Sequence, residues 1–369
     1  MSDVDVAVIG AGQAGLSAAY FLRRAGLDYV VIDGADGPGG AWQYRWPTLR
    51  LAAVHGIYQL PGMPLAQADP QTSAADVVAA YFASYEREFG LAVRRPVQVS
   101  AVRYGAGDRL LVQSPAGEWA ARAVINATGT WTRPFWPYYP GQGEFRGRQL
   151  HTADYRGPAE FAGQHVVVVG GGTSAVQLLA EISQVATTTW VTRRPPVIRD
   201  EPFTREDGRA AVALVDQRVR AGLPPGSIIG VTGLHLGPQA GPDLEEARAR
   251  GVLDRQPMFD RITPDGVAWA DGRTVHADVI LWCTGFRAAL DHLAPLRLRE
   301  PGGGIRMDGT RVVAEPRLHL VGYGPSASTI GANRAGRVAV REIRELLSAT
   351  PPDRSPVPAA ADRPVRAAS

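Results

Sequence analysis

Apolar runs that end in glycines alternate with helical patterns along this chain. The first succession begins with a β-branched run at 4–9, passes through a glycine turn into a helical pattern, and ends with an apolar run at 29–32. A second succession of the same kind begins at 165–169 and ends at 188–191. Strand, glycine turn, helix and strand in this order form the first part of a doubly wound unit. The pattern therefore predicts two copies of one supersecondary unit.

The segments around these two units predict further alternating elements. They are helices over 74–89, 207–221 and 330–347, and strands at 97–102, 110–113, 123–126, 279–285 and 318–322. Such alternation is typical of the α/β class. We expect two Rossmann-like dinucleotide-binding domains, one inserted into the other.

The domain boundaries follow from where the two units lie. The outer domain is expected over 1–135 and 280–350, and the inserted domain over 136–279. The tail 351–369 is rich in Pro, Ala and Arg, a composition typical of a disordered terminus.

Composition narrows the class of protein. The 369 residues are 45% hydrophobic and 20% charged, as in a globular enzyme, and a net charge of +3 argues for neither nucleic acid nor a membrane as partner. The 39 basic residues are all arginines and are scattered. The N-terminal apolar run lacks a basic region and is interrupted by glycines, so we expect neither a signal peptide nor a membrane span. With a single cysteine, we expect a cytoplasmic protein; a homodimer stays open.

The first glycine turn reads Gly10-x-Gly12-x-x-Gly15, directly after a predicted strand and at the start of a predicted helix. Glycines at this spacing allow a tight turn, close approach of the backbone to a pyrophosphate, and close packing of helix on strand. Asp33 ends the next strand, where a carboxylate can accept hydrogen bonds from both ribose hydroxyls. The turn therefore predicts a dinucleotide site; the alternative is a purely structural turn.

The second turn reads Gly170-x-Gly172-x-x-Ala175. Asp33 lies 23 residues after Gly10, and the residue 23 positions after Gly170 is Arg193. A carboxylate would repel a 2′-phosphate, whereas a guanidinium binds it with charge-assisted hydrogen bonds. The register therefore favours NADP over NAD. The alternative is that Arg193 and Arg194 are solvated charges at the end of a strand.

Several motifs in fixed order make the chain resemble the flavin-containing monooxygenases, the class B flavoprotein monooxygenases, and within them a small bacterial branch. These motifs are Gly10-Ala-Gly-Gln-Ala-Gly15, Gly39-Gly-Ala-Trp42, Ala127-Thr-Gly129, Phe145-x-Gly-x-x-x-His151 followed by Tyr155, and Gly170-Gly-Gly-Thr-Ser-Ala175. Together they cover residues 4 to about 337.

The resemblance implies the cofactors FAD and NADPH and assigns candidate residues to each. Those for FAD are Gly10, Gly12, Gln13, Gly15, Asp33, Gly40, Trp42, Arg50, Thr128, Gly129, Tyr323 and Thr329. Those for NADPH are Gly170, Gly172, Thr173, Ser174, Arg193 and Arg194. In related flavoproteins the helix that starts near Thr329 points its positive end at the flavin. The resemblance also implies that His151 belongs to a linker between domains, and we do not expect it to be a catalytic base.

Two departures from the family pattern bear on the chemistry. The residues after Tyr155 read Arg-Gly-Pro, without the Trp-Pro or Trp-Asp ending typical of Baeyer–Villiger enzymes, which favours oxygenation of a heteroatom. Many members also carry an asparagine near flavin C4a, and the segment 51–59 has none. His55 or Gln59 is the candidate catalytic residue in its place; the alternative for His55 is that it braces the loop.

The expected function is an NADPH- and FAD-dependent monooxygenase that transfers one oxygen atom from a flavin C4a-hydroperoxide to nitrogen or sulfur of a small molecule. Baeyer–Villiger oxygenation and a flavoprotein oxidase, reductase or redox sensor are the alternatives. A disulfide reductase needs two cysteines beside the flavin, and Cys283 is the only cysteine. We expect no metal site, because the seven histidines show no ligand-like spacing.

Overall fold

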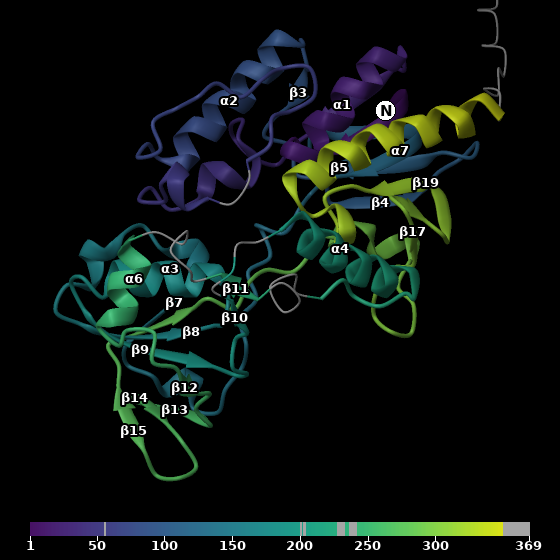
Figure 1. The fold of residues 1–369 in the computed structure, drawn as a ribbon. Helices are drawn as coiled ribbons and strands as arrows, with labels where there is room; N and C mark the ends of the chain where they lie inside the picture. The colour runs from purple at the N-terminus through teal and green to yellow at the C-terminus, as the bar shows by residue number, and fades with distance from the viewer. Residues whose placement is uncertain (55–56, 200, 202–203, 227–232, 236–241, 350–369) are drawn as a thin grey trace, which may run out of the picture.

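The computed structural model describes residues 1–54, 57–199, 201, 204–226, 233–235 and 242–349, and shows an α/β fold arranged as two bodies (Figure 1). Its α-helices are α1 (Gln13–Ala25), α2 (Ala74–Glu88), α3 (Thr173–Ile182), α4 (Arg205–Arg220), α6 (Pro242–Ala249) and α7 (Thr329–Ala349). His55 lies outside the described residues, and so does the tail predicted to be disordered.

The larger sheet lies in the body that contains the N-terminus (Figure 1). Its strands are β1 (Ser2–Ile9), β2 (Tyr29–Ile32), β3 (Val93–Arg94), β4 (Ala101–Tyr104), β5 (Leu110–Ser114), β6 (Gly117–Asn126), β17 (Met307–Asp308), β18 (Arg311–Val312) and β19 (Glu315–Leu320). The order is β17-β18-β19-β6-β1-β2-β3, and β4 and β5 join through the antiparallel pairing of β5 with β6. Around β1 the pairing is parallel, as the doubly wound pattern predicts.

Helices α1 and α7 cover one face of this sheet (Figure 1). The apolar positions of α1, including Leu16 and Leu22, are fully buried, and the helix ends at Gly26 in the left-handed conformation. A Cβ atom at Gly336 of α7 would come within 3.0 Å of the Ala18 nitrogen. Glycine at this position therefore allows the two helices to pack closely over the core.

The second sheet repeats the arrangement with five strands in the order β12-β9-β8-β16-β7. These are β7 (Arg148–His151), β8 (His165–Val169), β9 (Thr187–Thr192), β12 (Gln256–Pro257) and β16 (Val279–Trp282). Smaller sheets are formed by β10 (Ile198–Arg199) with β11 (Leu234–His235), and by β13 (Arg261–Thr263), β14 (Gly266–Ala268) and β15 (Thr274–His276). All five strands of the second sheet run in parallel, and Trp190 and Trp282 lie fully buried in its core.

Two passages of the chain between the bodies, near 133–135 and 285–287, lie side by side. The Phe135 nitrogen donates to the Gly285 carbonyl at 2.9 Å, and the Arg287 nitrogen donates to the Arg133 carbonyl at 2.7 Å. The fold is therefore that of two Rossmann-like domains, the second inserted into the first. The boundary predicted at 279/280 falls inside β16, which pairs with β7 and β8; we propose that the crossing begins after Trp282, because splitting a paired strand would break its hydrogen bonds.

Helix α4 also differs from the predicted division. It follows the second glycine unit in sequence, but it lies against the first body, beside β17 (Figure 1). Val219 is fully buried among side chains of the larger sheet, and Arg220 pairs with Asp308 at 2.9 Å. We propose that α4 is a part of the first domain in space, because its apolar face finds its burial there.

Candidate functional site

A cavity of about 540 Å³ opens at the carboxyl ends of β1, β2 and β6. Parallel strands present their following loops at this edge, which is where dinucleotides bind in open α/β sheets. Eight of the residues predicted to hold FAD line it: Gly10, Gly12, Gln13, Asp33, Gly40, Trp42, Thr128 and Gly129. These residues, which come from separate turns in the sequence, thus lie together around one cavity.

The glycines of the first turn are required by the backbone around them. Gly10 has a φ of +100°, and a Cβ atom there would lie 2.5 Å from the Ala127 carbonyl oxygen. A Cβ atom at Gly15 would collide with the Gly10 carbonyl oxygen, and one at Gly40 would lie 2.7 Å from the Gly12 Cα. Since side chains are excluded from the floor of the cavity, its backbone N–H groups at the start of α1 are open to a pyrophosphate.

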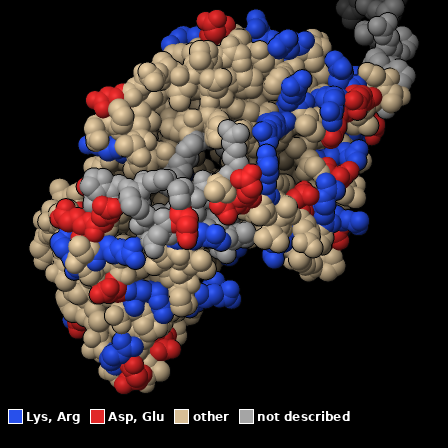
Figure 2. Space-filling view, in the orientation of Figure 1, with Lys and Arg blue, Asp and Glu red and all other residues tan. Residues whose placement is uncertain are grey.

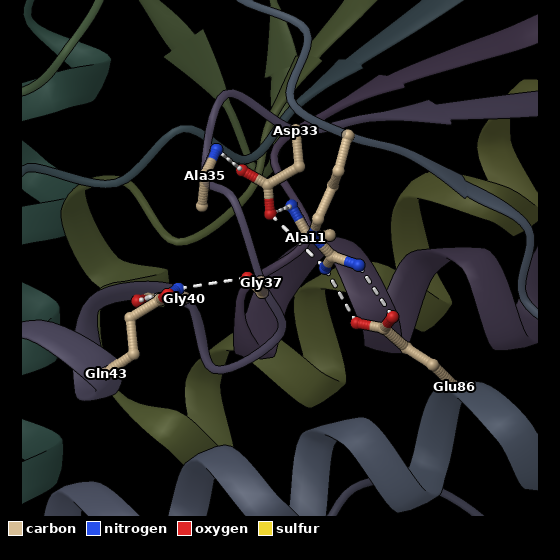
Figure 3. Close-up of polar contacts among 8 residues, drawn as sticks. Ala11, Asp33, Ala35, Gly37, Gly40, Gln43 and Glu86 are labelled. Carbon is tan, nitrogen blue, oxygen red and sulfur yellow. Dashed lines mark hydrogen bonds and ion pairs between the residues drawn. The ribbon is translucent and has the colours of Figure 1, made fainter.

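Asp33, the predicted ribose ligand, lines the cavity, and its carboxylate is anchored on several sides (Figure 3). It accepts hydrogen bonds from the nitrogens of Ala11 at 3.2 Å and Ala35 at 3.1 Å. Arg95 approaches it at 3.5 Å and forms a two-point ion pair with Glu86, with both N–O distances at 2.7 Å. The side chains of this triad are nearly buried, so the carboxylate is preorganised for a ligand.

A chain of buried polar groups forms another part of the cavity wall. His292 Nε2 lies 2.6 Å from Asn126 Oδ1, and Asn126 donates to Thr128 Oγ1 at 3.0 Å. Thr128 in turn donates to the Ala289 carbonyl at 2.7 Å. Burial lowers the pKa of His292 to about 4, so that the ring is neutral at pH 7 and its Nε2–H donates to Asn126.

Three other residues predicted to hold FAD, Gly15, Arg50 and Tyr323, do not line the cavity. Gly15 lies beneath the turn, and Arg50 is exposed and forms an isolated β-bridge with Ser73. Tyr323 precedes a short helical turn whose Ser326 does reach the cavity wall. Thr329 is the first residue of α7.

Of the two candidate catalytic residues, the structure describes Gln59, and it is not among the residues that line the cavity. Gln59 is exposed, and its carbonyl accepts a hydrogen bond from Asn333 at 2.7 Å. Asn333 also accepts one from Gln13, a cavity residue, at 2.9 Å. An asparagine therefore does hold this wall, but it comes from α7, which no motif near 51–59 could have indicated.

The second glycine turn reproduces the first in detail. A Cβ atom at Gly170 would collide with the Cys283 carbonyl, as one at Gly10 would with Ala127. Gly172 is the N-cap of α3, so Thr173 and Ser174 lie in its first turn. This is the geometry of an anion site at a helix N-terminus. Arg193 and Arg194 follow β9 and are exposed.

Cys283 and His151 are both buried, at the ends of β16 and β7 in the second sheet. Burial raises the pKa of the Cys283 thiol to about 12, which makes the sulfur unreactive at pH 7. His151 accepts from the Ala153 nitrogen at Nδ1 and lies 3.0 Å from the Gly285 carbonyl at Nε2. The ring thus ties β7 to the crossing, and burial lowers its pKa. We propose that His151 positions the linker between the two domains and is not a catalytic base.

Sequence reasoning missed Glu86, Arg95, Asn126, His292 and Arg45. Arg45 directly follows the turn that carries Trp42. A positively charged residue beside this motif could have been recognised from the sequence as a candidate site residue. Arg95 and Glu86 lie more than fifty residues beyond Asp33, and nothing in their local pattern marks them. The pairing of β3 with β2 brings Arg95, just after β3, to Asp33, and Glu86 of α2 pairs with Arg95 there.

Charged side chains on the face in view and potential metal ligands among the described residues bear on whether the protein has another kind of site. Acidic and basic side chains are interspersed over the face shown in Figure 2. Among the residues that the structure describes, no group of His, Cys, Asp and Glu could hold a metal ion. No helix within the described ranges is long and apolar enough to cross a membrane.

Comparison with known proteins points to flavin enzymes. The family described as pyridine nucleotide-disulphide oxidoreductase matches residues 7–206. A flavin-containing monooxygenase from Stenotrophomonas maltophilia is 42% identical, with a TM-score of 0.79, over 94% of this chain and 99% of that one. Indole-3-pyruvate monooxygenase YUCCA1 from Oryza sativa is 27% identical over 86% of each chain. The bacillithiol disulfide reductase of Bacillus cereus, at 18% identity and a TM-score of 0.70, shares the fold.

Proposed function

The chain belongs to the flavin-containing monooxygenases within the pyridine nucleotide-disulphide oxidoreductase family, and on that premise we propose that it uses NADPH and FAD to transfer one oxygen atom to nitrogen or sulfur of a small molecule. Its cofactors are FAD and NADPH, and its activity is that of a flavin-dependent monooxygenase. The finer assignment depends on this chain's own residues.

The cavity and the second turn fit these two cofactors. Asp33 suits the ribose of FAD, and the glycine floor leaves room for its pyrophosphate. Arg193 stands in the register of Asp33 at the second turn, where a guanidinium suits the 2′-phosphate of NADPH. Bound FAD would supply the redox chemistry, taking a hydride from NADPH and activating oxygen at its C4a atom.

The observation that carries the proposal is the isolation of Cys283. Family members that reduce disulfides need a reactive pair of cysteines, and this chain has one, which is buried and has a raised pKa. Electrons from NADPH therefore have no thiol acceptor in the protein, which supports oxygen as the acceptor. The Arg-Gly-Pro sequence after Tyr155 supports a heteroatom over a ketone as the oxygenated group.

Within this proposal the protein binds the cofactor, orients it and excludes water from it. The N–H groups at the start of α1 hold phosphate, and Asp33 fixes the ribose. Trp42 and Trp131 form an apolar part of the cavity wall. Such a wall keeps water from the reacting atoms, so that activated oxygen meets substrate before it is lost as peroxide.

Rapid-mixing spectroscopy of the FAD-loaded protein tests the proposal. After anaerobic reduction by NADPH, an oxygen pulse should produce a transient absorbance of oxygenated flavin, and a thioether or tertiary amine should shorten its life and appear as the oxide. Product from a cyclic ketone instead would favour Baeyer–Villiger chemistry. Reoxidation without a transient, with peroxide as the sole product, would favour an oxidase or redox sensor and reject the monooxygenase.

A further inference from the structure

Arg45 is a cation wedged between two tryptophans of the cavity wall. Its guanidinium carbon lies 4.8 Å from the centre of the Trp131 ring and 5.8 Å from that of Trp42. Both rings line the cavity. Cation–π contacts of this kind hold the side chain in place but leave the N–H groups in the plane of the guanidinium free to donate hydrogen bonds.

This guanidinium has no carboxylate partner in the part of the chain that the structure describes. By contrast, Arg133 on the neighbouring loop pairs with Asp291, and Arg95 pairs with Glu86. Arg45 is partly exposed, and none of its nitrogens is a buried atom without a hydrogen-bond partner. Burial nonetheless lowers its pKa, which means that its surroundings disfavour the charge. An incoming anion would relieve that cost.

Aromatic rings surround the same place and continue across the junction. Trp131 stacks on Phe286 at 4.8 Å and on Tyr44 at 6.3 Å between ring centres. Phe286 follows β16 of the second sheet, whereas Tyr44 and Trp131 line the cavity of the first body. Aromatic side chains gathered at a cavity wall favour contact with a flat, apolar ligand.

We propose that Arg45 is the anion-binding residue of the substrate site, and that the enzyme takes an aromatic carboxylate whose ring lies among Tyr44, Trp131 and Phe286. A single planar fork matches the two oxygens of a carboxylate. Phosphates are instead served by backbone N–H groups at the starts of α1 and α3. This inference rests on the proposed function and specifies its substrate class.

Two probes of the same shape separate charge from packing. 4-(Methylthio)benzoate and its uncharged amide are titrated by calorimetry into oxidised, FAD-loaded enzyme without NADPH. The wild type should bind the carboxylate roughly ten- to a hundredfold more tightly, as expected for a charge-assisted pair. In Arg45→Met this preference should disappear, and in Arg45→Lys it should be partly kept. Arg24→Met removes a similar cation–π contact, at 5.8 Å from Tyr20, and should keep the preference.

The remaining outcomes overturn the inference. Equal binding of the two probes by the wild type would show that the site does not select an anion. An equal loss of both probes in Arg45→Met and Arg45→Lys would assign Arg45 to packing. A loss of NADP⁺ binding with the carboxylate preference intact would assign it to the nucleotide. Oxidation of the uncharged amide to its sulfoxide tests the proposed function separately, since binding in the oxidised enzyme requires neither NADPH nor oxygen.

Discussion

At the scale of single residues, the carboxylate of Asp33 shows how a predicted ligand is held in place. Its two oxygens already accept hydrogen bonds from the Ala11 and Ala35 nitrogens, and Arg95 approaches at 3.5 Å (Figure 3). Glu86 fixes Arg95 from the far side. A ribose ligand therefore meets a side chain whose orientation is set before binding, which lowers the entropic cost of binding.

The triad separates stability from cofactor affinity. Arg95→Met should lower the free energy of unfolding by about 3 kcal/mol, because it leaves Glu86 buried without its partner. The double variant Arg95→Met/Glu86→Leu should recover most of that stability. It should still bind FAD more weakly than the wild type. Urea unfolding and FAD titration of the apoprotein measure the two effects. Wild-type FAD affinity in the double variant would contradict a role for Arg95 in positioning Asp33.

We expect the second nucleotide site to depend on one of two neighbouring arginines. Arg193→Ala should raise the Kd of NADPH about ten- to a hundredfold, by removing a charge-assisted contact to the 2′-phosphate. NADH lacks that phosphate and serves as the control, so its Kd should change little. Arg194→Ala tests the neighbour in the same titration. An equal effect on NADPH and NADH would show that neither arginine reads the phosphate.

The buried His292 predicts a pH dependence of stability. Its pKa is about 4 in the folded state and 6.5 when unperturbed, so between these values the unfolded chain binds more protons. Stability should be full above about pH 6.5 and fall as the pH drops toward 4. His292→Gln keeps an N–H for Asn126 but cannot titrate, so its urea midpoint should change less between pH 7 and pH 5. A slope equal to that of the wild type would assign the acid sensitivity to other groups.

At the scale of elements, the two glycine turns are built alike. In each, the first glycine lies against the carbonyl of the residue after the adjacent strand, Ala127 after β6 and Cys283 after β16. The Ala127 nitrogen donates to Ile9 at 2.7 Å, and the Cys283 nitrogen donates to Val169 at 2.8 Å. The repeat seen in sequence is thus a repeat of backbone contacts.

Neighbouring glycines in the second turn offer a matched pair of variants. Gly170→Ala should abolish NADPH binding while FAD stays bound, because its φ is +149° and its Cβ atom would meet the Cys283 carbonyl. A Cβ atom at Gly171 would find its nearest neighbour at 3.7 Å, so Gly171→Ala should bind NADPH nearly normally. Titration of each nucleotide measures the effect. Equal behaviour of the two variants would contradict the backbone argument.

At the scale of the whole molecule, α4 connects the inserted segment to the first body. Val215 and Val219 lie against Gly324, in the helical turn whose Ser326 lines the cavity. The Gly304 nitrogen donates to the Gly222 carbonyl at 3.1 Å just beyond the helix. The cavity wall therefore depends on a helix that follows the second nucleotide unit in sequence.

This contact predicts a long-range effect on the cofactor. Val219→Asp places a carboxylate in a fully buried position, and it should destabilise the protein by several kcal/mol and weaken FAD binding. Leu214→Asp, on the exposed side of the same helix, should change both by about 0.5 kcal/mol or less. Thermal unfolding and FAD titration test the pair. Matching effects of the two substitutions would show that α4 does not support the cavity.

The sequence by itself determined the two nucleotide turns, the α/β class and the cofactors. These features are local, because each depends on a segment of a few tens of residues. Examples are the positive φ at Gly10, the close approach of backbones and the alternation of apolar runs. Eight predicted FAD residues accordingly line one cavity.

Only the tertiary structure decided which distant groups complete the cavity. Arg95 reaches Asp33 through the pairing of β3 with β2, and His292 reaches Asn126 from a segment 166 residues away. Arg45 gains its setting only when the loop of Trp131 folds over it. The apolar pattern of α4 likewise does not indicate which surface buries the helix, and that surface belongs to the first body. Such contacts depend on strand order and packing, which local periodicity does not encode.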